Sequence, residues 1–512
     1  MLAIAELLRP SAFPHPAPDP VAEETHISWV VLAGEFAYKI KKPVRLPFLD
    51  YSSLAARKHF CEEEVRLNRR LAPELYLGVS TIVRTSGGLA IDQEGPIVEY
   101  AVRMRRFSSA DRLDRRLAEG RLIGPDIDRC AIRVADMHRA APQADPGNAM
   151  QAAAAALDPV TACLDALGHR SPAVQDARRW LADREPVLTA VFENRHRSGW
   201  VRECHGDLHL ANLADLDGCI VPFDAIEFDS ALRWTDIQAD AAFLLMDLQS
   251  RHRRDLGWRF YDGWLARTGD YEGVAALRFY LIYRHLVRAK VDRIRLSQAL
   301  EDSTERRRIE SRLAVHLGSI RDLVRPGRPA LILTHGLSAS GKSTVARNLA
   351  AEMPMVRLPA DLVRKRMAGL DPFDTSAPPP AGLYDHEFTE QVYGELRRLA
   401  DLALDAGWNT IVDATFLTAE RRRPLMELAV ERGLPVLCLH CRAPEAELRR
   451  RIVARRRAGT DPSDADLAVL EDQMAKIEGP AADERDLWLD LDTARLPPAE
   501  ELAAGLRSRL WA

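Results

Sequence analysis

The sequence predicts an α+β fold followed by a parallel α/β fold, in a chain of 512 residues. Its first part begins with strand-like segments and becomes helical after about residue 110, whereas its last part alternates strands with helices. Between them, VRPGRP at residues 324–329 carries two prolines and a glycine, which favour neither helix nor strand. We therefore expect two domains, residues 1–325 and residues 328–512. The length is sufficient for both to form hydrophobic cores.

The predicted strands of the first part are rich in β-branched and aromatic residues. They are HISWVVLAG at 26–34, FAYKIKK at 36–42, YLGVSTIVR at 76–84 and GPIVEYAVRM at 95–104. Later in this part, the alanine run at 152–156 predicts a helix or a linker beside one.

The second part carries the pattern of a parallel sheet covered by helices. A buried strand is predicted at 330–334 and a helix at 344–351, and further strands at 355–358, 410–413, 435–439 and 487–491. A helix ended by Gly407 is predicted from four apolar residues at intervals of four, Phe388, Val392, Leu396 and Ala400.

Composition excludes several functional classes. A net charge of −4 and an isoelectric point near 6.4 argue against a dedicated surface for nucleic acid or anionic lipid. No apolar run approaches the length of a membrane span. Glu6 interrupts the first apolar stretch and no basic leader precedes it, so we do not expect a signal peptide.

Cysteine usage predicts a cytoplasmic protein, because seven cysteines are few and odd in number. Cys438 and Cys441 form a C-x-x-C pair within VLCLHC, which reads as a buried strand. No second pair lies nearby, so a zinc site is not expected there.

A phosphate-binding loop is predicted at GLSASGKS, residues 336–343, because it fits G-x-x-x-x-G-K-[ST] between a strand and a helix. Successive backbone N–H groups and the helix N-terminus would bind phosphate oxygens. Lys342 would reach the outer phosphates and the Ser343 hydroxyl would hold Mg²⁺. The predicted cofactors are ATP and Mg²⁺, bound by Gly336, Ser338, Ala339, Ser340, Gly341, Lys342, Ser343 and Thr344.

A second phosphate-handling pattern occurs in HGDLHLAN, residues 205–212, followed by Asp224 in IVPFDAIEF. Phosphoryl transfer to a hydroxyl needs a carboxylate that accepts the proton and ligands for the metal that bridges the phosphates. Asp207, Asn212 and Asp224 supply these groups in the order found in protein kinases.

Residues from about 25 to 300 resemble the aminoglycoside phosphotransferase (kinase-like) superfamily, whose catalytic loop is typically H-G-D-x-x-x-x-N. The resemblance implies a bilobal kinase-like fold in which Asp207 is the catalytic base, Asn212 and Asp224 hold Mg²⁺, and His205 braces the loop. The whole chain resembles a bacterial arrangement in which such a domain is fused to a P-loop kinase. This likeness includes HISWVVLAG, YKIKKPVRLPFLD and LNRRLAPELYL.

Lysine is rare here, at 8 of the 71 basic residues, yet three lysines crowd into AYKIKKP. A kinase-like small lobe needs a strand lysine that reaches the phosphates and a helix glutamate that holds it. Lys39 is the first candidate and Lys41 the second, with Glu64 as the expected partner and Glu63 as its alternative. The segment lacks G-x-G-x-x-G before this strand, where only Gly34 is available.

The segment PADLVRKRM follows the second strand of the α/β part. Its D-x-x-R spacing resembles chloramphenicol phosphotransferases, zeta toxins and polynucleotide kinases, which implies that Asp361 takes a proton from the acceptor hydroxyl and that Arg364 contacts nucleotide. A helix N-cap is the alternative role for Asp361. Asp413, at the end of a β-branched strand, is expected in the Mg²⁺ shell.

The segment LRRRIVARRR, residues 448–457, predicts an arginine-rich helix. A solvated face or an RNA contact is possible for such a run, but in nucleoside-kinase-like proteins it forms a lid. Arg450 and Arg455, or Arg456 in its place, are candidate clamps on the transition state. The proline-rich segment at 371–382 is the expected acceptor-binding loop.

Together these patterns predict an ATP-dependent phosphotransferase with two nucleotide sites and a small hydroxylated molecule as acceptor. One alternative is a regulatory ATP-binding protein with an inactive kinase-like domain. The other is a polynucleotide or nucleotide-sugar kinase in the C-terminal half, which the acidic isoelectric point disfavours.

Overall fold

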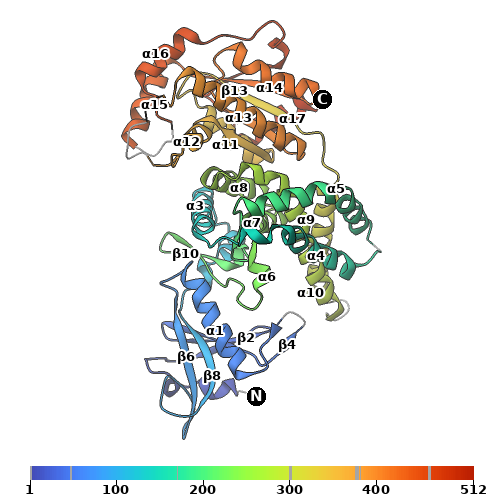
Figure 1. Ribbon diagram of the computed structural model, residues 1–512. Coiled ribbons are helices and arrows are strands. Elements are labelled where there is room, and N and C mark those ends of the chain that lie inside the picture. Colours follow the sequence, from blue (N-terminus) through green and yellow to red (C-terminus); the bar gives the residue numbers. More distant parts are fainter. Residues whose placement is uncertain are drawn as a thin grey trace. The chain divides into compact units, whose positions relative to one another are not determined.

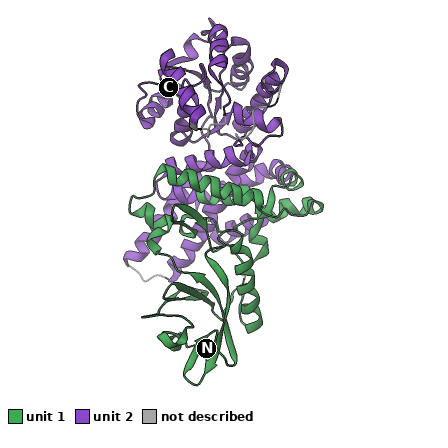
Figure 2. Cartoon of the chain, turned by 90° about the vertical axis from the view of Figure 1, so that its left-hand side faces the viewer, with its two compact units in different colours: residues 1–156, 193–244 green, residues 157–192, 245–512 purple. Residues whose placement is uncertain are grey.

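The computed structural model describes residues 3–46, 49–169, 171–298, 303–374, 380, 382–458 and 463–511. The chain forms two compact units, residues 1–156 with 193–244 (unit 1) and residues 157–192 with 245–512 (unit 2), coloured separately in Figure 2. The predicted boundary at 324–329 falls inside unit 2, so the division into residues 1–325 and 328–512 stays a prediction about the sequence. Within the described residues, no helix has the length and apolar character needed to cross a membrane.

Unit 1 begins with a six-stranded sheet in which every neighbouring pair of strands is antiparallel. The strand order is β1-β2-β3-β8-β6-β7, and helix α1 (Leu54–Arg69) packs against β6 and β8 (Figure 1). The Ser53 side chain caps α1 by accepting from Ala56 N–H. The strands are β1 (Val21–Glu24), β2 (Ser28–Ala33), β3 (Phe36–Lys41), β6 (Tyr76–Thr85), β7 (Gly88–Ile91) and β8 (Ile97–Arg105). The four strands predicted here are confirmed.

Unit 1 also holds three short antiparallel strand pairs, β4 (Arg45–Leu46) with β5 (Leu49–Asp50), β9 with β12, and β10 with β11. The predicted catalytic loop connects β9 to β10, and α3 packs against β11. The bounds are α2 (Leu113–Ala118), α3 (Gly124–Ala140), β9 (Val201–Glu203), β10 (Leu213–Leu216), β11 (Cys219–Pro222), α6 (Ser230–Arg233) and β12 (Trp234–Asp236).

Long helices follow, as the sequence predicts. The alanine run lies in α4, so its helical interpretation is confirmed. The bounds are α4 (Ala149–Leu167), α5 (Pro172–Arg197), α7 (Ile237–Ser250), α8 (Arg254–Thr268), α9 (Val274–Gln298) and α10 (Thr304–Val324).

The rest of unit 2 is built on a five-stranded, fully parallel sheet of order β14-β15-β13-β16-β17. The strands are β13 (Leu331–His335), β14 (Met355–Pro359), β15 (Asn409–Asp413), β16 (Val436–Arg442) and β17 (Trp488–Asp492). Each predicted strand is confirmed, with ends moved by up to three residues. The helices are α11 (Lys342–Glu352), α12 (Ala360–Met367), α13 (His386–Asp405), α14 (Ala419–Glu431), α15 (Glu445–Ala458), α16 (Leu467–Lys476) and α17 (Ala499–Leu510). Strands β14 and β15 lie on one side of β13, and strands β16 and β17 lie on the other. In parallel α/β sheets, ligands bind at the carboxyl ends of the strands where the strand order reverses in this way.

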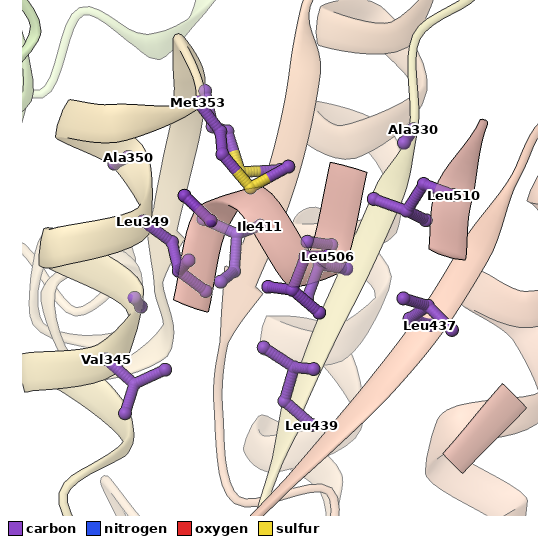
Figure 3. Close-up of a cluster of buried hydrophobic side chains, with 14 of the residues drawn as sticks. Ala330, Val345, Leu349, Ala350, Met353, Ile411, Leu437, Leu439, Leu506 and Leu510 are labelled. Atoms are coloured by element: carbon purple, nitrogen blue, oxygen red, sulfur yellow. The ribbon is translucent and has the colours of Figure 1, made fainter. Parts of the chain in front are cut away.

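One face of this sheet is covered by α11 and α17, whose apolar side chains form a single core with the strands (Figure 3). Val345 and Leu349 of α11 and Leu506 of α17 are all buried against Ile332, Ile411 and Leu439 of the strands. This packing fixes the start of α11, and therefore the phosphate-binding loop, relative to the sheet.

Helices α8 and α9 pack on the same α/β part. Helix α8 lies against α11 and β14, and α9 lies against α13. The Trp408 indole N–H donates to the carbonyl of Val274 at 3.1 Å, and its ring lies 5.3 Å from that of Trp258. Arg278 donates to the carbonyls of Ala406 and Gly407. These contacts join α8 and α9 to the α/β part across the proline-containing segment at 324–329.

Candidate active sites

The loop between β13 and α11 has the strained backbone that a phosphate-binding loop requires. Gly336 has φ of +135° and Gly341 of +90°, both unfavourable for a residue with a side chain. A Cβ atom on Gly336 would lie 2.4 Å from the Cys441 carbonyl oxygen. Ala339 also has positive φ, at +61°. The two glycines of the sequence pattern are therefore required by the backbone at these positions.

Three functional side chains meet at this loop. Lys342 is buried and donates from Nζ to the Leu337 carbonyl at 2.6 Å, and its desolvation lowers the pKa of the ammonium. Ser343 Oγ donates to Asp413 Oδ1 at 3.1 Å. Asp413 reaches this position because β15 pairs in parallel with β13 and both strands end at the same edge of the sheet. The hydroxyl and carboxylate oxygens of this pair suit Mg²⁺, a hard cation that prefers oxygen ligands.

Three further residues contact the loop that the sequence did not identify. Gln473 Oε1 on α16 accepts from Ser338 N–H at 2.7 Å. Thr493, just after β17, donates to the Ser340 carbonyl at 2.6 Å. Arg451 on α15 donates to the Ala339 carbonyl at 3.3 Å and to Thr493 Oγ1 at 3.2 Å. All three come from distant segments, and of these only Arg451 lies in a run that the sequence indicates, the predicted lid helix.

The arginine-rich run forms α15, as predicted, but its members differ in position. Arg450 has 73% of its side chain exposed and forms an ion pair with Glu447, so it is not among the residues that contact the loop. Arg455 donates to the Ala465 carbonyl at 2.8 Å. Of these three arginines, Arg451 is the one that contacts the phosphate-binding loop. The clamp roles of Arg450 and Arg455 stay predictions.

Asp361 lies in the first turn of α12, whose N-cap residue is Pro359. The alternative interpretation of Asp361 as the N-cap is therefore wrong. Burial raises the pKa of the Asp361 carboxyl, against the opposing effects of a hydrogen bond from Ser463 and the charge of Arg364. A raised pKa suits a proton acceptor for a hydroxyl, since it brings the group nearer to neutral pH.

Arg364, three residues later, is buried and donates to the Leu383 carbonyl at 2.9 Å and to Thr389 Oγ1 at 3.1 Å. Its guanidinium also lies 5.0 Å from the centre of the Tyr384 ring. These contacts fix it against the segment that follows the predicted acceptor loop. Within that loop, residues 375–379 and 381 lie outside the described residues.

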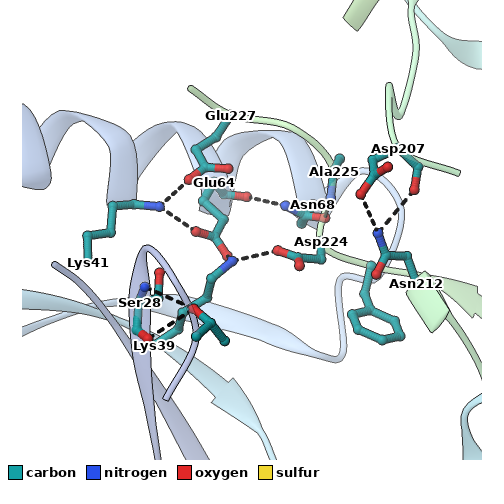
Figure 4. Close-up of polar contacts among 12 residues, drawn as sticks. Ser28, Lys39, Lys41, Glu64, Asn68, Asp207, Asn212, Asp224, Ala225 and Glu227 are labelled. Atoms are coloured by element: carbon teal, nitrogen blue, oxygen red, sulfur yellow. Dashed lines mark hydrogen bonds and ion pairs between the residues drawn. The ribbon is translucent and has the colours of Figure 1, made fainter. Parts of the chain in front are cut away.

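In unit 1, the predicted strand lysine and helix glutamate form an ion pair (Figure 4). Lys39 Nζ donates to Glu64 Oε1 at 2.8 Å and to Asp224 Oδ1 at 2.5 Å. Burial lowers the pKa of Lys39, but the charges of Asp224 and Glu64 outweigh it and raise this pKa well above its usual value. Burial likewise opposes ionisation of Glu64, yet Lys39 and Lys41 lower its pKa to about 2. Both groups are therefore charged at neutral pH.

Lys41 makes a second, deeper network with the same glutamate. Its Nζ donates to Glu64 Oε2 at 2.7 Å and also to Glu227 Oε1, which accepts from the Tyr51 hydroxyl at 2.5 Å. Sequence reasoning missed Glu227 and Tyr51. The one available signal was Glu227 itself, an acid within the apolar run that carries Asp224.

The predicted catalytic loop is held from both sides. Asn212 Nδ2 donates to the Asp207 carbonyl at 3.0 Å and to its Oδ2 at 3.2 Å. The carboxylate of Asp240 accepts from the N–H groups of His205 and Gly206 at 2.8 and 3.0 Å. His205 in turn contacts the Phe223 carbonyl at 2.9 Å, which agrees with the bracing role that the resemblance implies.

Asp224 has φ of +64°, an unusual conformation for a residue other than glycine. Its N–H donates to the Tyr76 hydroxyl at 2.9 Å, and the next N–H, of Ala225, donates to Asn68 Oδ1 at 2.9 Å. These bonds hold the carboxylate toward Lys39. Asn212 and Asp224 offer oxygen ligands of the kind that Mg²⁺ prefers, so the residues fit the predicted metal, whose binding there stays a prediction.

Two groups of residues that include cysteine bear on the question of a further metal. Cys438 and Cys441 are buried, and desolvation raises the pKa of each thiol, which disfavours the thiolate that zinc requires. In the described parts of the chain, His138, Cys204 and Asp240 also lie within 4.8 Å of one another. However, the Asp240 oxygens already accept from the backbone of the catalytic loop, which accounts for their position.

Comparisons with known proteins agree with this architecture. Residues 331–480 match the sequence family described as an AAA domain. Over 480 residues, the chain is 30% identical to uncharacterized protein Rv2004c of Mycobacterium tuberculosis and to uncharacterized protein Mb2027c of Mycobacterium bovis, which covers 88% of this chain and 89% of each relative.

Solved structures match parts of the chain more distantly. A sugar kinase from Janibacter sp. HTCC2649 is 24% identical, with 36% of this chain and 95% of that chain covered and a TM-score of 0.27. A choline/ethanolamine kinase family protein from Mesorhizobium loti is 12% identical, with 59% and 92% covered and a TM-score of 0.36. Because it is 30% identical to these mycobacterial proteins along most of both lengths, the chain belongs to their family.

Proposed function

We propose that this protein is an ATP-dependent phosphotransferase that transfers the γ-phosphoryl group to a hydroxyl of a small molecule at its P-loop site. The observation that carries the proposal is the meeting of Lys342, Ser343 and Asp413 at the end of β13. The kinase-like site, with Lys39, Glu64 and Asp224 in contact, is proposed as a second ATP site with its own acceptor.

At the P-loop site, Ser343 and Asp413 would hold Mg²⁺, and the ion would supply neutralisation of the charge that develops in transfer. The residues of the chain do the rest. Backbone N–H groups of the loop and of the first turn of α11 bind phosphate oxygens. The Ser338 N–H and the Lys342 ammonium exchange their present acceptors, Gln473 and the Leu337 carbonyl, for phosphate oxygens. Asp361 accepts the proton of the acceptor hydroxyl, since its raised pKa suits that task at neutral pH.

At the kinase-like site, Asp207 would orient the acceptor hydroxyl and accept its proton. Asn212 and Asp224 would hold the metal, and Lys39 would pass from Asp224 to the phosphates while Glu64 keeps it in place. The ion pair of Lys39 with Glu64 supports this role, because a phosphate-binding lysine must be charged and fixed before ATP arrives.

The proposal is tested by following label from γ-³²P-ATP into a metabolite extract with the full-length protein. Lys342→Ala should abolish one set of labelled products and Asp207→Asn a second set. Products that depend on Lys342 alone would favour a regulatory role for the kinase-like domain. Labelling of RNA ends but not of small molecules would favour the polynucleotide kinase alternative. Failure of both variants to change any product would contradict the proposed phosphotransferase.

A further inference from the structure

A buried ion-pair chain connects helix α8 to the magnesium-shell carboxylate of the P-loop site. Arg357, on β14, donates from Nε to Asp262 Oδ1 at 3.0 Å and from Nη2 to Asp262 Oδ2 at 3.1 Å. Its remaining terminal nitrogen, Nη1, donates to Asp413 Oδ2 at 3.1 Å. The side chains of all three residues are nearly inaccessible, with exposed fractions of 6% for Asp262, 6% for Arg357 and 3% for Asp413.

Sheet register explains how Arg357 reaches Asp413. Strands β14 and β15 are parallel neighbours, and Arg357 is paired with Ile411. Asp413 lies two residues beyond Ile411, so it shares the face of the sheet on which Arg357 lies. The other oxygen of Asp413 accepts from Ser343 Oγ. One carboxylate therefore joins Arg357 to the residue that would hold Mg²⁺.

The balance of charge shows why two acids are needed. Arg357 alone with Asp413 would neutralise the carboxylate, because a buried arginine and a buried acid form a closed pair. Asp262 takes two of the three donated hydrogen bonds, so the three groups together carry one net negative charge. The planar guanidinium donates two parallel hydrogen bonds to Asp262 and a third to Asp413 from one fixed plane, a geometry that an ammonium does not match. Asp413, which accepts one of the three hydrogen bonds, is therefore the less fully paired of the two acids, and it lies next to Ser343.

Helix α8 holds Asp262 rigidly. Its neighbours Tyr261 and Trp264 are buried, and Trp258, one turn earlier, is buried against Trp408. The helix also packs along α11, the helix that begins with Lys342. Asp262 is thus fixed by the same packing that fixes the phosphate-binding loop.

From this geometry we infer that Asp262 and Arg357 are positioning residues that make Mg²⁺ binding at the P-loop site depend on helix α8. The inference rests on the proposed function, since it concerns the metal of that site. Arg357 orients Asp413, and Asp262 draws enough of the Arg357 charge away for Asp413 to remain an effective metal ligand. A helix that precedes the predicted domain boundary therefore completes the P-loop site.

Asp262→Asn is the decisive substitution, because it keeps the shape of the side chain and removes its charge. Arg357 would then pair with Asp413 alone and compete with Mg²⁺. We expect the Mg²⁺ concentration that gives half-maximal binding of a fluorescent ATP analogue to rise about tenfold. Binding of the analogue without Mg²⁺ should change less than twofold, since Lys342 and the loop amides are untouched. Arg357→Lys should also raise the Mg²⁺ concentration needed for half-maximal binding. Asp262→Glu, which keeps the negative charge, should leave this concentration close to that of the unsubstituted protein.

The titrations use the full-length protein with Asp224→Ala, so that Mg²⁺-dependent binding at the kinase-like site is removed. Glu272→Gln is the matched control, because its exposed ion pair with Arg398 also joins the segment after α8 to the α/β part but does not reach Asp413. The melting temperature of each variant without nucleotide or metal serves as a second readout.

A shift in Mg²⁺ dependence for Asp262→Asn, absent for Glu272→Gln, would support the inference. A lower melting temperature with unchanged Mg²⁺ dependence would overturn it, since Asp262 would then have a structural role only. Analogue binding that is equal with and without Lys342→Ala would instead overturn the proposed function, and the inference with it.

Discussion

Lys39 and Lys41 share one carboxylate, since Lys39 Nζ lies 2.8 Å from Glu64 Oε1 and Lys41 Nζ lies 2.7 Å from Glu64 Oε2. They lie two residues apart on β3 and therefore on the same face of the sheet. Their surroundings differ, because Lys39 retains 14% exposure and contacts Asp224, whereas Lys41 is fully buried with Glu227. Only Lys39 is open to a ligand.

Lys39→Met is predicted to weaken ATP binding, whereas Lys41→Met is predicted to lower the stability of the fold. Lys39→Met should weaken Mg²⁺-dependent ATP binding at the kinase-like site about tenfold or more and change the melting temperature little, because it removes a phosphate contact. Lys41→Met leaves Glu227 buried without its cation, which should cost about 3 kcal/mol or more of stability. Calorimetric ATP titration and urea unfolding, both in the Lys342→Ala protein, measure the two effects. Equal loss of ATP binding in two stably folded variants would contradict this assignment.

Asp207 and Asp224 should separate turnover from binding. Asp207→Asn should lower turnover by about 10² to 10⁴-fold and leave ATP affinity near normal, because a general base acts in the chemical step. Asp224→Ala should weaken Mg²⁺-dependent ATP binding itself. Both are measured with Lys342→Ala in the same protein, so that the P-loop site is silent. Parallel losses of stability and binding in Asp207→Asn would indicate a structural residue.

Gly336→Ala should destabilise the P-loop site. The new Cβ atom would lie 2.4 Å from the Cys441 carbonyl oxygen, and φ of +135° is strained for alanine, so a cost of roughly 1 to 3 kcal/mol is expected. Gly505→Ala is the control, since nothing lies within 4 Å of its added atom. Because Gly505 is in α17, that change should stabilise the protein by up to about 1 kcal/mol. Chemical denaturation compares them.

Adjacent arginines on α15 provide another comparison. Arg451→Ala removes hydrogen bonds to the Ala339 carbonyl and Thr493 and should weaken ATP binding at the P-loop site severalfold, because the loop loses a support. Arg450→Ala removes an exposed ion pair with Glu447, which contributes little. ATP affinities in the Asp224→Ala background distinguish them. A larger loss for Arg450→Ala would support the clamp role that the sequence suggests for it.

The stability of the helical part should fall in acid because of two buried imidazoles. His285 and His316, on α9 and α10, contact each other through their Nδ1 atoms at 3.0 Å. Burial and its neighbour His316 lower the pKa of His285 to about 3. Burial lowers that of His316 to about 4, with Arg288 and Arg312 acting in the same direction and Asp292 and Asp247 opposing.

Both folded-state pKa values lie below the unfolded value of about 6.5, so the unfolded chain binds more protons. The contribution of the two imidazoles to stability is fully present above about pH 6.5 and is lost as the pH falls toward the folded-state values, by several kcal/mol in total. Urea unfolding at pH 7 and pH 4.5 measures how much the free energy of unfolding changes with pH. His316→Gln should make this change smaller, whereas the exposed His169→Gln should not alter it.

The features that could be predicted from the sequence depend on short local patterns. The strands of both sheets follow from short β-branched runs, and the phosphate-binding loop from eight contiguous residues. Lys39 could be singled out because lysine is rare in this chain. The chemistry of these positions depends on residue type and spacing, which sequence records directly.

The rest depends on contacts between distant segments. Thr493 and Gln473 reach the loop from segments more than a hundred residues away, and nothing in their own surroundings marks them. Arg357 did carry a signal, as a charged residue in the otherwise apolar strand MVRLP, because a buried charge needs a partner. Its partner Asp262 could not be identified from the sequence, because the periodicity of apolar residues does not show where α8 packs.

The hydrogen bond from the Trp408 indole limits where recombination can separate the α/β segment from the rest of the chain. A recombination event at residues 324–329 would transfer the α/β segment without Val274, the acceptor of the Trp408 N–H, and without Arg278, which binds the adjoining loop carbonyls. The recipient would inherit an apolar surface with unmatched polar atoms, a condition that promotes aggregation. Descendants that exchange this segment should therefore carry α8 and α9 with it, and crossover points should lie before residue 254.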